Sequence, residues 1–253
     1  MTLNKFDTEY YLELYNSRQF AKKLQRAREI RDEGLSRISK GYVSWSGGKD
    51  STAVLFLVRE VCPYYKCVKH DDDCEYPDTL KYVKKLQAKY GLNLDILQPS
   101  FSVWEKIVEN AEILGEEIHN SNIDFASESF YGVMKKYYDE GDYDGMFWGL
   151  RAEESKARKH NAIFNGANYL KGDSKICCPI TWWTGDDVFA YLVGNNIQIN
   201  PLYYKCKFTE PGRIRDGWWL PGKTAYKGHL SFLRYYYPDL YQKLLTIRRD
   251  LNV

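Results

Sequence analysis

The predicted fold is built around the stretch Gly41-Tyr-Val-Ser-Trp-Ser-Gly-Gly-Lys-Asp-Ser-Thr-Ala-Val-Leu-Phe-Leu-Val58. Aromatic and β-branched residues at its start favour a strand, two glycines interrupt that strand, and the apolar run from Thr52 to Glu60 predicts a buried helix. In such a turn, backbone N–H groups at the positive end of the helix can hold phosphate oxygens, and Lys49 adds charge. A plain capped turn is the alternative for a lone Gly-Gly pair, but the full run from Ser46 to Ser51 favours an anion-binding site.

Length, composition and charge exclude some classes of protein. With 253 residues, the chain can bury the core of one large α/β domain. Its 36 basic and 34 acidic residues give a net charge of +2, so no overall field attracts nucleic acid, although a local basic patch stays open. No apolar run approaches the roughly 20 residues that span a bilayer, and the first residues lack an apolar signal core, so we expect a cytoplasmic protein without a membrane partner. The six cysteines contain no C-x-x-C pair, which predicts reduced thiols.

The segments on either side of the glycine turn continue an α/β pattern. Residues 10–39 have the spacing of one or two amphipathic helices that pack outside the first strand; a dimerisation arm, and hence a homo-oligomer, is the alternative. Residues 64–69 and 92–97 predict two further strands, with a helix between them that begins at a proline and ends at a glycine. Residues 115–142 have no clean periodicity and predict a helical excursion to which we assign no function.

Charged residues follow two of the predicted strands. Asp71 comes after the second strand, at the edge where parallel sheets bind ligands, although a solvated acidic turn before the next helix explains it as well. Arg151 and Arg158 follow the strand predicted at 143–149, and their spacing of seven residues places both on one side of a helix. Two guanidinium groups there can bind phosphate or sulfate; an exposed helix with a Glu154–Arg158 pair is the alternative.

Three motifs, in this order, resemble the phosphoadenosine phosphosulfate (PAPS) reductase family. Ser46-Gly-Gly-Lys-Asp-Ser51 is similar to the SGG-x-DS pyrophosphate loop, or PP-loop, of enzymes that cleave ATP between its α and β phosphates. Gly149-Leu-Arg-Ala-Glu-Glu-Ser-Lys-Ala-Arg158 resembles the family signature G-[IL]-R-x-x-x-S-x-x-R. The segments 175–192 and 200–204 resemble a third, mainly structural motif, so the resemblance covers about residues 38–206. The family also holds the small subunit of ATP sulfurylase, and the chain is similar to the PP-loop enzymes of DNA phosphorothioation.

The resemblance implies an α/β fold in which a mostly parallel sheet is wound with helices, similar to the Rossmann-like adenine nucleotide alpha-hydrolase fold. Residues 1–40 would form an N-terminal helical segment, 41–206 the nucleotide-binding α/β domain, and 207–253 a C-terminal extension that is basic, aromatic and helical. That extension could clamp an acidic substrate or stack a nucleic-acid base, but an aromatic core with a solvated rim explains the same residues.

The resemblance also implies the residues of the site. In the family the loop grips the nucleotide phosphates, and the segment after the second strand lies beside the nucleotide and its metal, which offers Asp71 as a ligand through Mg²⁺. No other metal-ligand spacing emerges from the sequence. We expect catalytic roles for Lys49, Asp50, Arg151 and Arg158. The nucleotide and its phosphates are expected to contact Ser44, Ser46, Gly47, Gly48, Lys49, Asp50, Ser51, Thr52, Asp71, Gly149, Arg151, Ser155 and Arg158.

The chain departs from the family in its cysteines. Many PAPS reductases attack the sulfonucleotide with a Cys in a Glu-Cys-Gly-x-His tail, and this sequence has no Cys after Cys206. Relatives with an iron–sulfur cluster carry a late Cys-x-x-Cys pair, whereas the comparable segment Gly217-Trp-Trp-Leu-Pro221 has none, so no iron–sulfur cluster is expected. Reduction of a sulfonucleotide would need electrons from a partner or from an internal Cys.

Together these features predict an enzyme of the PAPS reductase family in sulfur metabolism or sulfur modification. It would bind ATP or a PAPS-type nucleotide and act at the α-phosphate or the sulfo group, as a PP-loop ATP pyrophosphatase and transferase or as an oxidoreductase. In the ATP version, Mg²⁺ and Lys49 neutralise the leaving pyrophosphate while an unidentified acceptor attacks. The alternative from another class is a non-catalytic module that binds a nucleotide or a nucleic acid.

Overall fold

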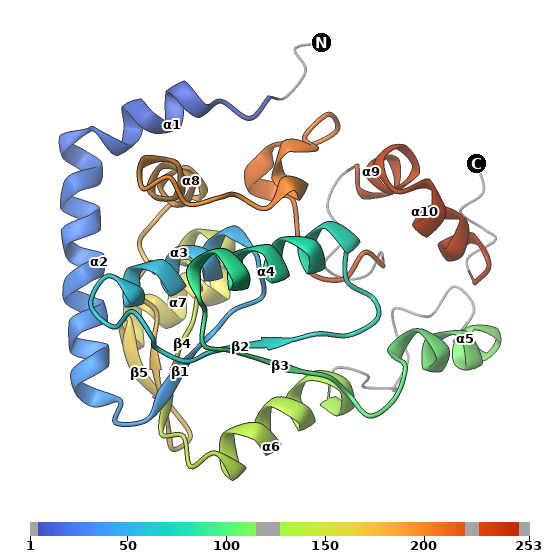
Figure 1. The fold of residues 1–253 in the computed structure, drawn as a ribbon, viewed down its shortest axis with the longest axis horizontal. Helices are drawn as coiled ribbons and strands as arrows, with labels where there is room; N and C mark the ends of the chain where they lie inside the picture. The colour runs from blue at the N-terminus through green and yellow to red at the C-terminus, as the bar shows by residue number, and fades with distance from the viewer. Residues whose placement is uncertain (1–4, 115–126, 221–227, 248–253) are drawn as a thin grey trace.

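The computed structural model describes residues 5–114, 127–220 and 228–247, and its centre is a six-stranded sheet (Figure 1). The strand order is β3-β2-β1-β4-β6-β5, and every neighbouring pair is parallel except β5 with β6, which are antiparallel at one edge. The mostly parallel α/β sheet is therefore confirmed. The strands are β1 Gly41–Ser44, β2 Cys67–His70, β3 Leu94–Leu97, β4 Gly145–Phe147, β5 Asn168–Lys171 and β6 Ser174–Cys177.

The register brings the carboxyl ends of the central strands to one edge of the sheet. Val43 of β1 lies opposite Cys67 of β2 and Phe147 of β4, and Phe147 lies opposite Cys177 of β6. Segments that leave parallel strands at this edge meet in a crevice. The predicted phosphate loop leaves from β1 and the predicted arginine segment from β4, so both begin at the same edge.

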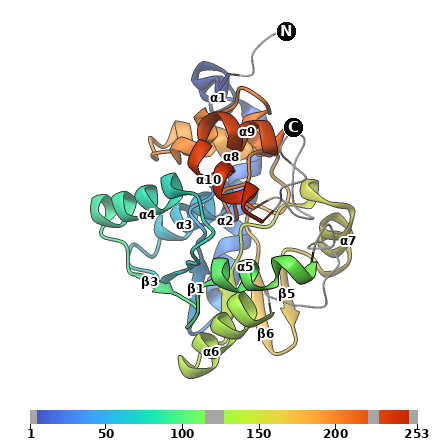
Figure 2. The same cartoon turned by 90° about the vertical axis from the view of Figure 1, so that its right-hand side faces the viewer.

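Helices cover both faces of the sheet (Figure 1, Figure 2). α2, α3, α4 and α8 lie on one face, and α6 lies on the other. α2 comes close to the sheet through Gly34, where a Cβ atom would lie 2.5 Å from the Sγ atom of Cys177. On the opposite face, the ring of Tyr42 lies 5.0 Å from that of Tyr143. The helices are α1 Thr8–Tyr15, α2 Arg18–Arg37, α3 Lys49–Arg59, α4 Pro77–Tyr90, α5 Val103–Leu114, α6 Val133–Glu140, α7 Lys156–Asn165, α8 Gly185–Gly194, α9 His229–Tyr236 and α10 Pro238–Leu245.

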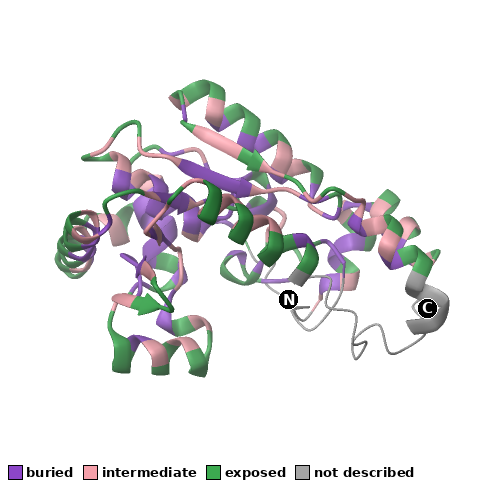
Figure 3. Cartoon of the chain, turned by 90° about the horizontal axis from the view of Figure 1, so that it is seen from below, coloured by how far each residue is buried: buried purple, intermediate pink, exposed green. Residues whose placement is uncertain are grey.

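Burial follows this layered arrangement. The central strands are buried, and the outward faces of the flanking helices are exposed (Figure 3). The apolar run that predicted a buried helix forms most of α3, where Val54, Leu55 and Leu57 are fully buried. Among the described residues, no helix combines the length and the apolar character needed to cross a membrane.

Helix signals in the sequence are confirmed at α4 and α8. α4 begins at Pro77 and ends before Gly91, whose φ of +57° is the left-handed conformation that glycine adopts easily. α8 follows a capping box in which the Thr184 hydroxyl accepts the N–H of Asp187 and the Asp187 carboxylate accepts the N–H of Thr184.

The N-terminal helices differ from the expectation for residues 10–39. The segment predicted at 115–142 lies partly outside the described residues. α2 packs on β5, β6 and α3, and α1 packs on α8, so the N-terminal helices reach well beyond the first strand. Of the excursion predicted at 115–142, residues 115–126 lie outside the described residues. The described part consists of a π-helix, Ser127–Gly132, which continues into α6. The division into segments 1–40, 41–206 and 207–253 stays a prediction.

Candidate functional site

The predicted phosphate loop, residues 46–51, connects β1 to α3. Gly48 is the N-cap residue of α3, and Gly47 has a φ of +90°, which favours glycine. The N–H of Ser46 donates to Oγ of Ser51 at 3.2 Å, and the N–H of Gly48 donates to Oγ of Ser46 at 3.2 Å. These contacts hold a tight turn at the positive end of α3, where phosphate oxygens are stabilised.

Close approach of other segments explains the glycines of the site. A Cβ atom on Gly47 would lie 2.9 Å from Cγ2 of Val83 on α4. A Cβ atom on Gly149, just after β4, would lie 2.7 Å from the backbone N of Ser51. Gly149 therefore allows the β4 end to lie directly against the phosphate loop.

Asp50 connects the two cations of the predicted site. Its Oδ2 atom accepts a hydrogen bond from Nζ of Lys49 at 2.7 Å, and its Oδ1 atom accepts one from Nε of Arg151 at 2.6 Å. Lys49 is 5% exposed and Arg151 is 3% exposed. Burial favours a higher pKa for Asp50, but the charges of Lys49 and Arg151 outweigh it and hold that pKa below its ordinary value. The structure thus brings together three of the four residues expected to be catalytic.

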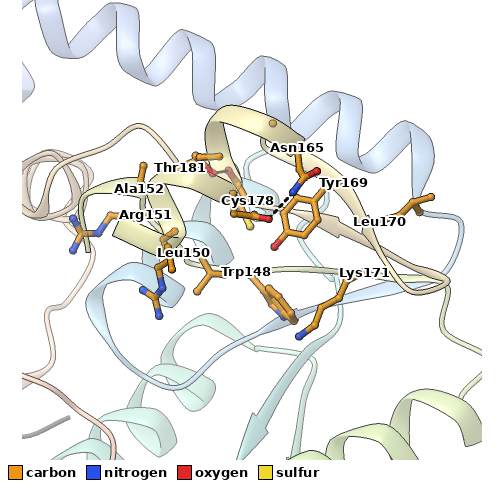
Figure 4. A pocket seen from close by; sticks show the side chains of 15 residues that line it. Trp148, Leu150, Arg151, Ala152, Asn165, Tyr169, Leu170, Lys171, Cys178 and Thr181 are labelled. Atoms are coloured by element: carbon orange, nitrogen blue, oxygen red, sulfur yellow. Dashed lines mark hydrogen bonds between the residues drawn. The ribbon is translucent and has the colours of Figure 1, made fainter. Parts of the chain in front are cut away.

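The prediction that Arg151 and Arg158 share one helix is wrong. Arg151 precedes a short 3₁₀ helix, Ala152–Glu154, and Ser155 is extended, so α7 begins only after Ser155. The helix starts anew there because the Ser155 hydroxyl accepts the N–H of Arg158 at 3.1 Å and caps α7. Arg158 pairs with Glu154, the ion pair named by the alternative interpretation. Both arginines nevertheless line one cavity, in which Figure 4 labels Arg151.

Three other residues predicted for the site, Ser44, Thr52 and Asp71, make contacts of other kinds. Ser44 is the last residue of β1, and Thr52 is fully buried with its Oγ1 atom accepting from the Trp45 indole at 3.0 Å, which is a packing role. Asp71 follows β2 and accepts from the side chain of Gln98 at 3.1 Å. Its other carboxylate oxygen, Oδ1, is buried and has no hydrogen-bond partner among the described residues. That oxygen is available to a ligand.

Asp216 also contacts the phosphate loop, and the sequence does not predict this contact. The hydroxyl of Ser46 donates to Oδ2 of Asp216 at 3.1 Å, and the hydroxyl of Thr79 donates to its carbonyl oxygen at 3.4 Å. A Cβ atom on Gly48 would lie 2.4 Å from Oδ1 of Asp216, so this carboxylate lies directly on the phosphate loop. No local signal marks Asp216, because it reaches the loop only when a segment 170 residues away folds over it.

A buried pair beneath the loop is the second feature that the sequence analysis misses. Lys69 on β2 is 1% exposed and donates from Nζ to both carboxylate oxygens of Glu75, at 2.6 and 2.7 Å. The same Nζ atom lies 3.3 Å from the carbonyl oxygen of Ser46 and donates to it. Burial raises the pKa of Glu75 to about 8, against the lowering effect of Lys69. Lys69 directly follows Cys67 and Val68 in a parallel strand, and a charge at such a position is the signal that could have revealed it.

Asp72, Asp73 and Cys74 form the group with metal-ligand spacing in the described part of the chain. Their carboxylates already have protein donors. Asp72 accepts from the N–H of Cys74 at 2.9 Å and from the Trp218 indole, and Asp73 accepts from the N–H of Trp104 at 3.0 Å. These contacts connect the β2 end to α5 and to residue 218, which is a structural role.

The six cysteines are free, and all except Cys62 are buried. Burial raises the pKa of Cys67 and of Cys178 to about 12, and it also raises the pKa values of Cys74, Cys177 and Cys206. Thiols in such surroundings stay protonated at neutral pH and are weak nucleophiles.

The similarity to known proteins covers the segments that carry the motifs described above. Residues 40–216 match the family model described as the phosphoadenosine phosphosulfate reductase domain. An adenosine 5'-phosphosulfate reductase of Bacillus mycoides is 27% identical over 199 residues, which cover 74% of this chain and 82% of that protein. An uncharacterized protein of Methanocaldococcus jannaschii is 27% identical over 237 residues, covering 89% of this chain but only about half, 54%, of that relative.

Two solved structures share the fold. The PAPS reductase of Candida auris, a phosphate complex, superposes with a TM-score of 0.57 at 18% identity over 74% of this chain and 90% of that chain. The FMN adenylyltransferase of Candida glabrata, in complex with FAD and inorganic pyrophosphate, superposes with a TM-score of 0.55 at 15% identity over 78% of this chain and 66% of that chain. At these identities, the similarity concerns the fold.

Proposed function

Because the chain belongs to the phosphoadenosine phosphosulfate reductase family, we propose that it is an enzyme that binds an adenine nucleotide with residues 46–51 and acts at its α-phosphate. The observation that carries the proposal is the Asp50 bridge between Lys49 and Arg151 at the N-terminus of α3. Two buried cations beside a helix N-terminus are suited to oxyanions that gain charge during phosphoryl chemistry. The family relation favours a role in sulfur metabolism or sulfur modification.

In the proposed reaction, an acceptor oxyanion attacks the α phosphorus of ATP. The bond from that phosphorus to the bridging oxygen of the β phosphate breaks, and pyrophosphate leaves with the bonding electron pair. Residues 46–51 hold the β and γ phosphates, and Lys49 balances the charge on the leaving group. In this proposal Arg151 holds the α-phosphate oxygens, so positioning and electrostatics supply the catalysis.

Mg²⁺ fits beside this site. The Oδ1 atom of Asp71 is buried without a hydrogen-bond partner in the described part of the chain, and carboxylate oxygens are ligands that Mg²⁺ prefers. Bound there with a nucleotide, the ion would neutralise part of the phosphate charge.

Reduction of a sulfonucleotide is the second candidate, favoured by the adenosine 5'-phosphosulfate reductase relative. It requires a thiolate or an external reductant. Cys178 lines the cavity beside Arg151, but burial raises the pKa of its thiol to about 12. Transfer from ATP therefore ranks ahead of reduction by an internal Cys.

Calorimetric titration of the reduced protein with Mg-ATP, and separately with PAPS, tests the proposal. We expect the wild type to bind Mg-ATP and the Lys49→Ala variant to bind it at least about tenfold more weakly, because a charge-assisted contact to phosphate is lost. Lys84→Ala is the matched control, since Lys84 lies exposed on α4. Its affinity should equal that of the wild type.

Each other outcome points to a different function. Tighter binding of PAPS than of Mg-ATP would favour reduction. Nucleotide binding without pyrophosphate release in the presence of any acceptor tried would favour a non-catalytic module. Binding of neither nucleotide would contradict the proposed role of residues 46–51.

A further inference from the structure

A cavity of about 380 Å³ lies between α7 and the edge of the sheet formed by β4, β6 and β5 (Figure 4). We call it the α7 cavity. Arg151 and Ala152 lie at one end, Tyr169 and Lys171 lie at the other, and Trp148 lies between them (Figure 4). The cavity therefore extends from the predicted phosphate site to the outer edge of the sheet.

The lining of the α7 cavity combines aromatic rings with positive charge. Trp148 and Tyr169 are half-buried, and Nζ of Lys171 lies 5.0 Å from the centre of the Trp148 ring. The lining residues all lie in the described part of the chain and none carries a carboxylate, whereas three are cations: Arg151, Arg158 and Lys171. Arg151 pairs with Asp50 and Glu153, and Arg158 pairs with Glu154, so Lys171 is the lining cation for which the described residues provide no ion pair. Ring faces favour stacking with a planar ligand, and cations favour an anionic group.

A second cavity, which includes Glu153 in its lining, has more negative than positive side chains. It measures about 640 Å³, and its lining includes Glu153, Asp186 and Glu210 beside Arg213. Three carboxylates against one guanidinium disfavour an anion there. A third cavity, of about 460 Å³, is also lined by lysines and aromatic rings, but the α7 cavity is the one that includes Arg151 of the predicted site.

Resting on the proposed function, we infer that the α7 cavity binds the acceptor, and that the acceptor is a planar aromatic or heteroaromatic molecule with one anionic group. The volume of about 380 Å³ is near the lower end of the range for small-molecule sites. It suits one ring system with one anionic substituent. The ring lies against Trp148 and Tyr169, the anionic group faces Lys171, and a separate oxygen of the acceptor at the Arg151 end is the attacking group.

Two contacts connect the α7 cavity to the phosphate loop. Arg151 lines the cavity, while its Nε atom donates to Asp50 in the loop. Gly149 lies between two lining residues of the cavity, and it packs so closely that a Cβ atom would lie 2.7 Å from the backbone N of Ser51. A nucleophile at the Arg151 end of the cavity is thereby directed at a nucleotide on the loop.

Binding of 1-naphthyl phosphate tests the ligand class, with 1-naphthol as the neutral analogue. We expect Tyr169→Ala to weaken binding of 1-naphthyl phosphate about tenfold through lost stacking, and Lys171→Ala to weaken it about threefold through lost charge. Phe164→Ala is the matched control, because Phe164 is 71% exposed and does not line the cavity. This control should bind like the wild type, and 1-naphthol should bind more weakly than its phosphate.

Lys49→Ala separates this inference from the proposed function. It should leave 1-naphthyl phosphate binding unchanged while weakening Mg-ATP binding. Loss of probe binding in Lys49→Ala would place the probe on the phosphate loop and overturn the inference. Equal probe binding by the Tyr169→Ala, Lys171→Ala and wild-type proteins, or no saturable binding, would overturn it as well.

A competition experiment tests the acceptor role. The probe and the ATP analogue AMPCPP should bind the same molecule together, because the inference gives them adjoining sites. Mutual exclusion would show that the α7 cavity holds part of the nucleotide, and this result would overturn the acceptor role. Lys171→Ala, altered at an exposed side chain, keeps the test informative if Tyr169→Ala does not fold.

Discussion

The carboxylate of Asp216 accepts a hydrogen bond from the Ser46 hydroxyl at 3.1 Å, so a negative charge lies at the entrance of the phosphate loop. Its Oδ1 atom lies so close to Gly48 that a Cβ atom on this glycine would come within 2.4 Å of it. An incoming phosphate and this carboxylate would compete for the same positive end of α3.

Asp216→Asn should therefore tighten binding of inorganic pyrophosphate about fivefold at low ionic strength, corresponding to about 1 kcal/mol of relieved repulsion. Titration calorimetry measures the change, and the gain should shrink as salt is added. Asp173→Asn, altered at an exposed position between β5 and β6, should have no effect. Weaker binding by Asp216→Asn would instead mean that this carboxylate helps to hold the ligand.

Gly149→Ala should destabilise the protein by about 1–3 kcal/mol, because the added Cβ atom would lie 2.7 Å from the backbone N of Ser51 and 2.8 Å from the backbone C of Asp50. Backbone atoms cannot turn aside as a flexible side chain does, so Mg-ATP affinity should fall as well. Gly212→Ala is the control, since its Cβ atom would meet nothing within 4 Å. Urea denaturation of both variants measures the difference, and equal stabilities would contradict the close approach.

Lys69→Met should cost more stability at pH 9 than at pH 6. Burial raises the pKa of Glu75 from 4.5 to about 8, and removing Lys69 removes the charge that opposes this rise. A carboxyl with a raised pKa binds its proton more tightly in the folded protein, so its stabilising effect is lost as pH rises toward the folded value. The slope reaches at most about 1.4 kcal/mol per pH unit for one group.

Chemical denaturation at several pH values measures this dependence. The double variant Lys69→Met/Glu75→Gln is the control, because it lacks the titrating carboxyl and should lose the extra slope. An equal cost of Lys69→Met at pH 6 and pH 9 would show that the folded protein does not hold Glu75 in its protonated form.

Asp50→Asn should lower the free energy of unfolding by about 2–3 kcal/mol at neutral pH, because Lys49 and Arg151 lose their shared partner. The pKa of Asp50 is held below its ordinary 3.8, so its contribution is present above that value and is lost as pH falls through the lower folded value. The stability difference between wild type and variant should accordingly shrink below about pH 4. Acid denaturation monitored by circular dichroism tests this, and a difference that stays constant to pH 2 would contradict it.

Local motifs made much of the fold predictable. The run from Gly41 to Val58 predicts a strand, a turn and a buried helix, and the structure contains β1, the loop and α3 there. Pro77 and Gly91 mark the ends of α4 because their backbone preferences act within a few residues. The edge strand β5 had no such signal, since its pairing with β6 depends on a hairpin that the pattern does not reveal.

The candidate site was predicted less completely. Lys49, Asp50 and Arg151 were named from their motifs, and the structure brings their charges within hydrogen-bond distance. The shared helix proposed for Arg151 and Arg158 was wrong, because spacing alone does not show that Ser155 interrupts the helix and caps the next one.

By itself, the sequence determined the family, the mostly parallel α/β fold and the loop at residues 46–51, because strand, glycine turn and helix preferences act between near neighbours. Only the tertiary structure decided that Asp216 lies on this loop, that Lys69 and Glu75 support it, and that Arg151 borders the α7 cavity. The contact between Asp216 and the loop joins residues far apart in the chain, and burial sets the protonation of Glu75. Neither is visible in local spacing, because both arise when the sheet brings its carboxyl ends together.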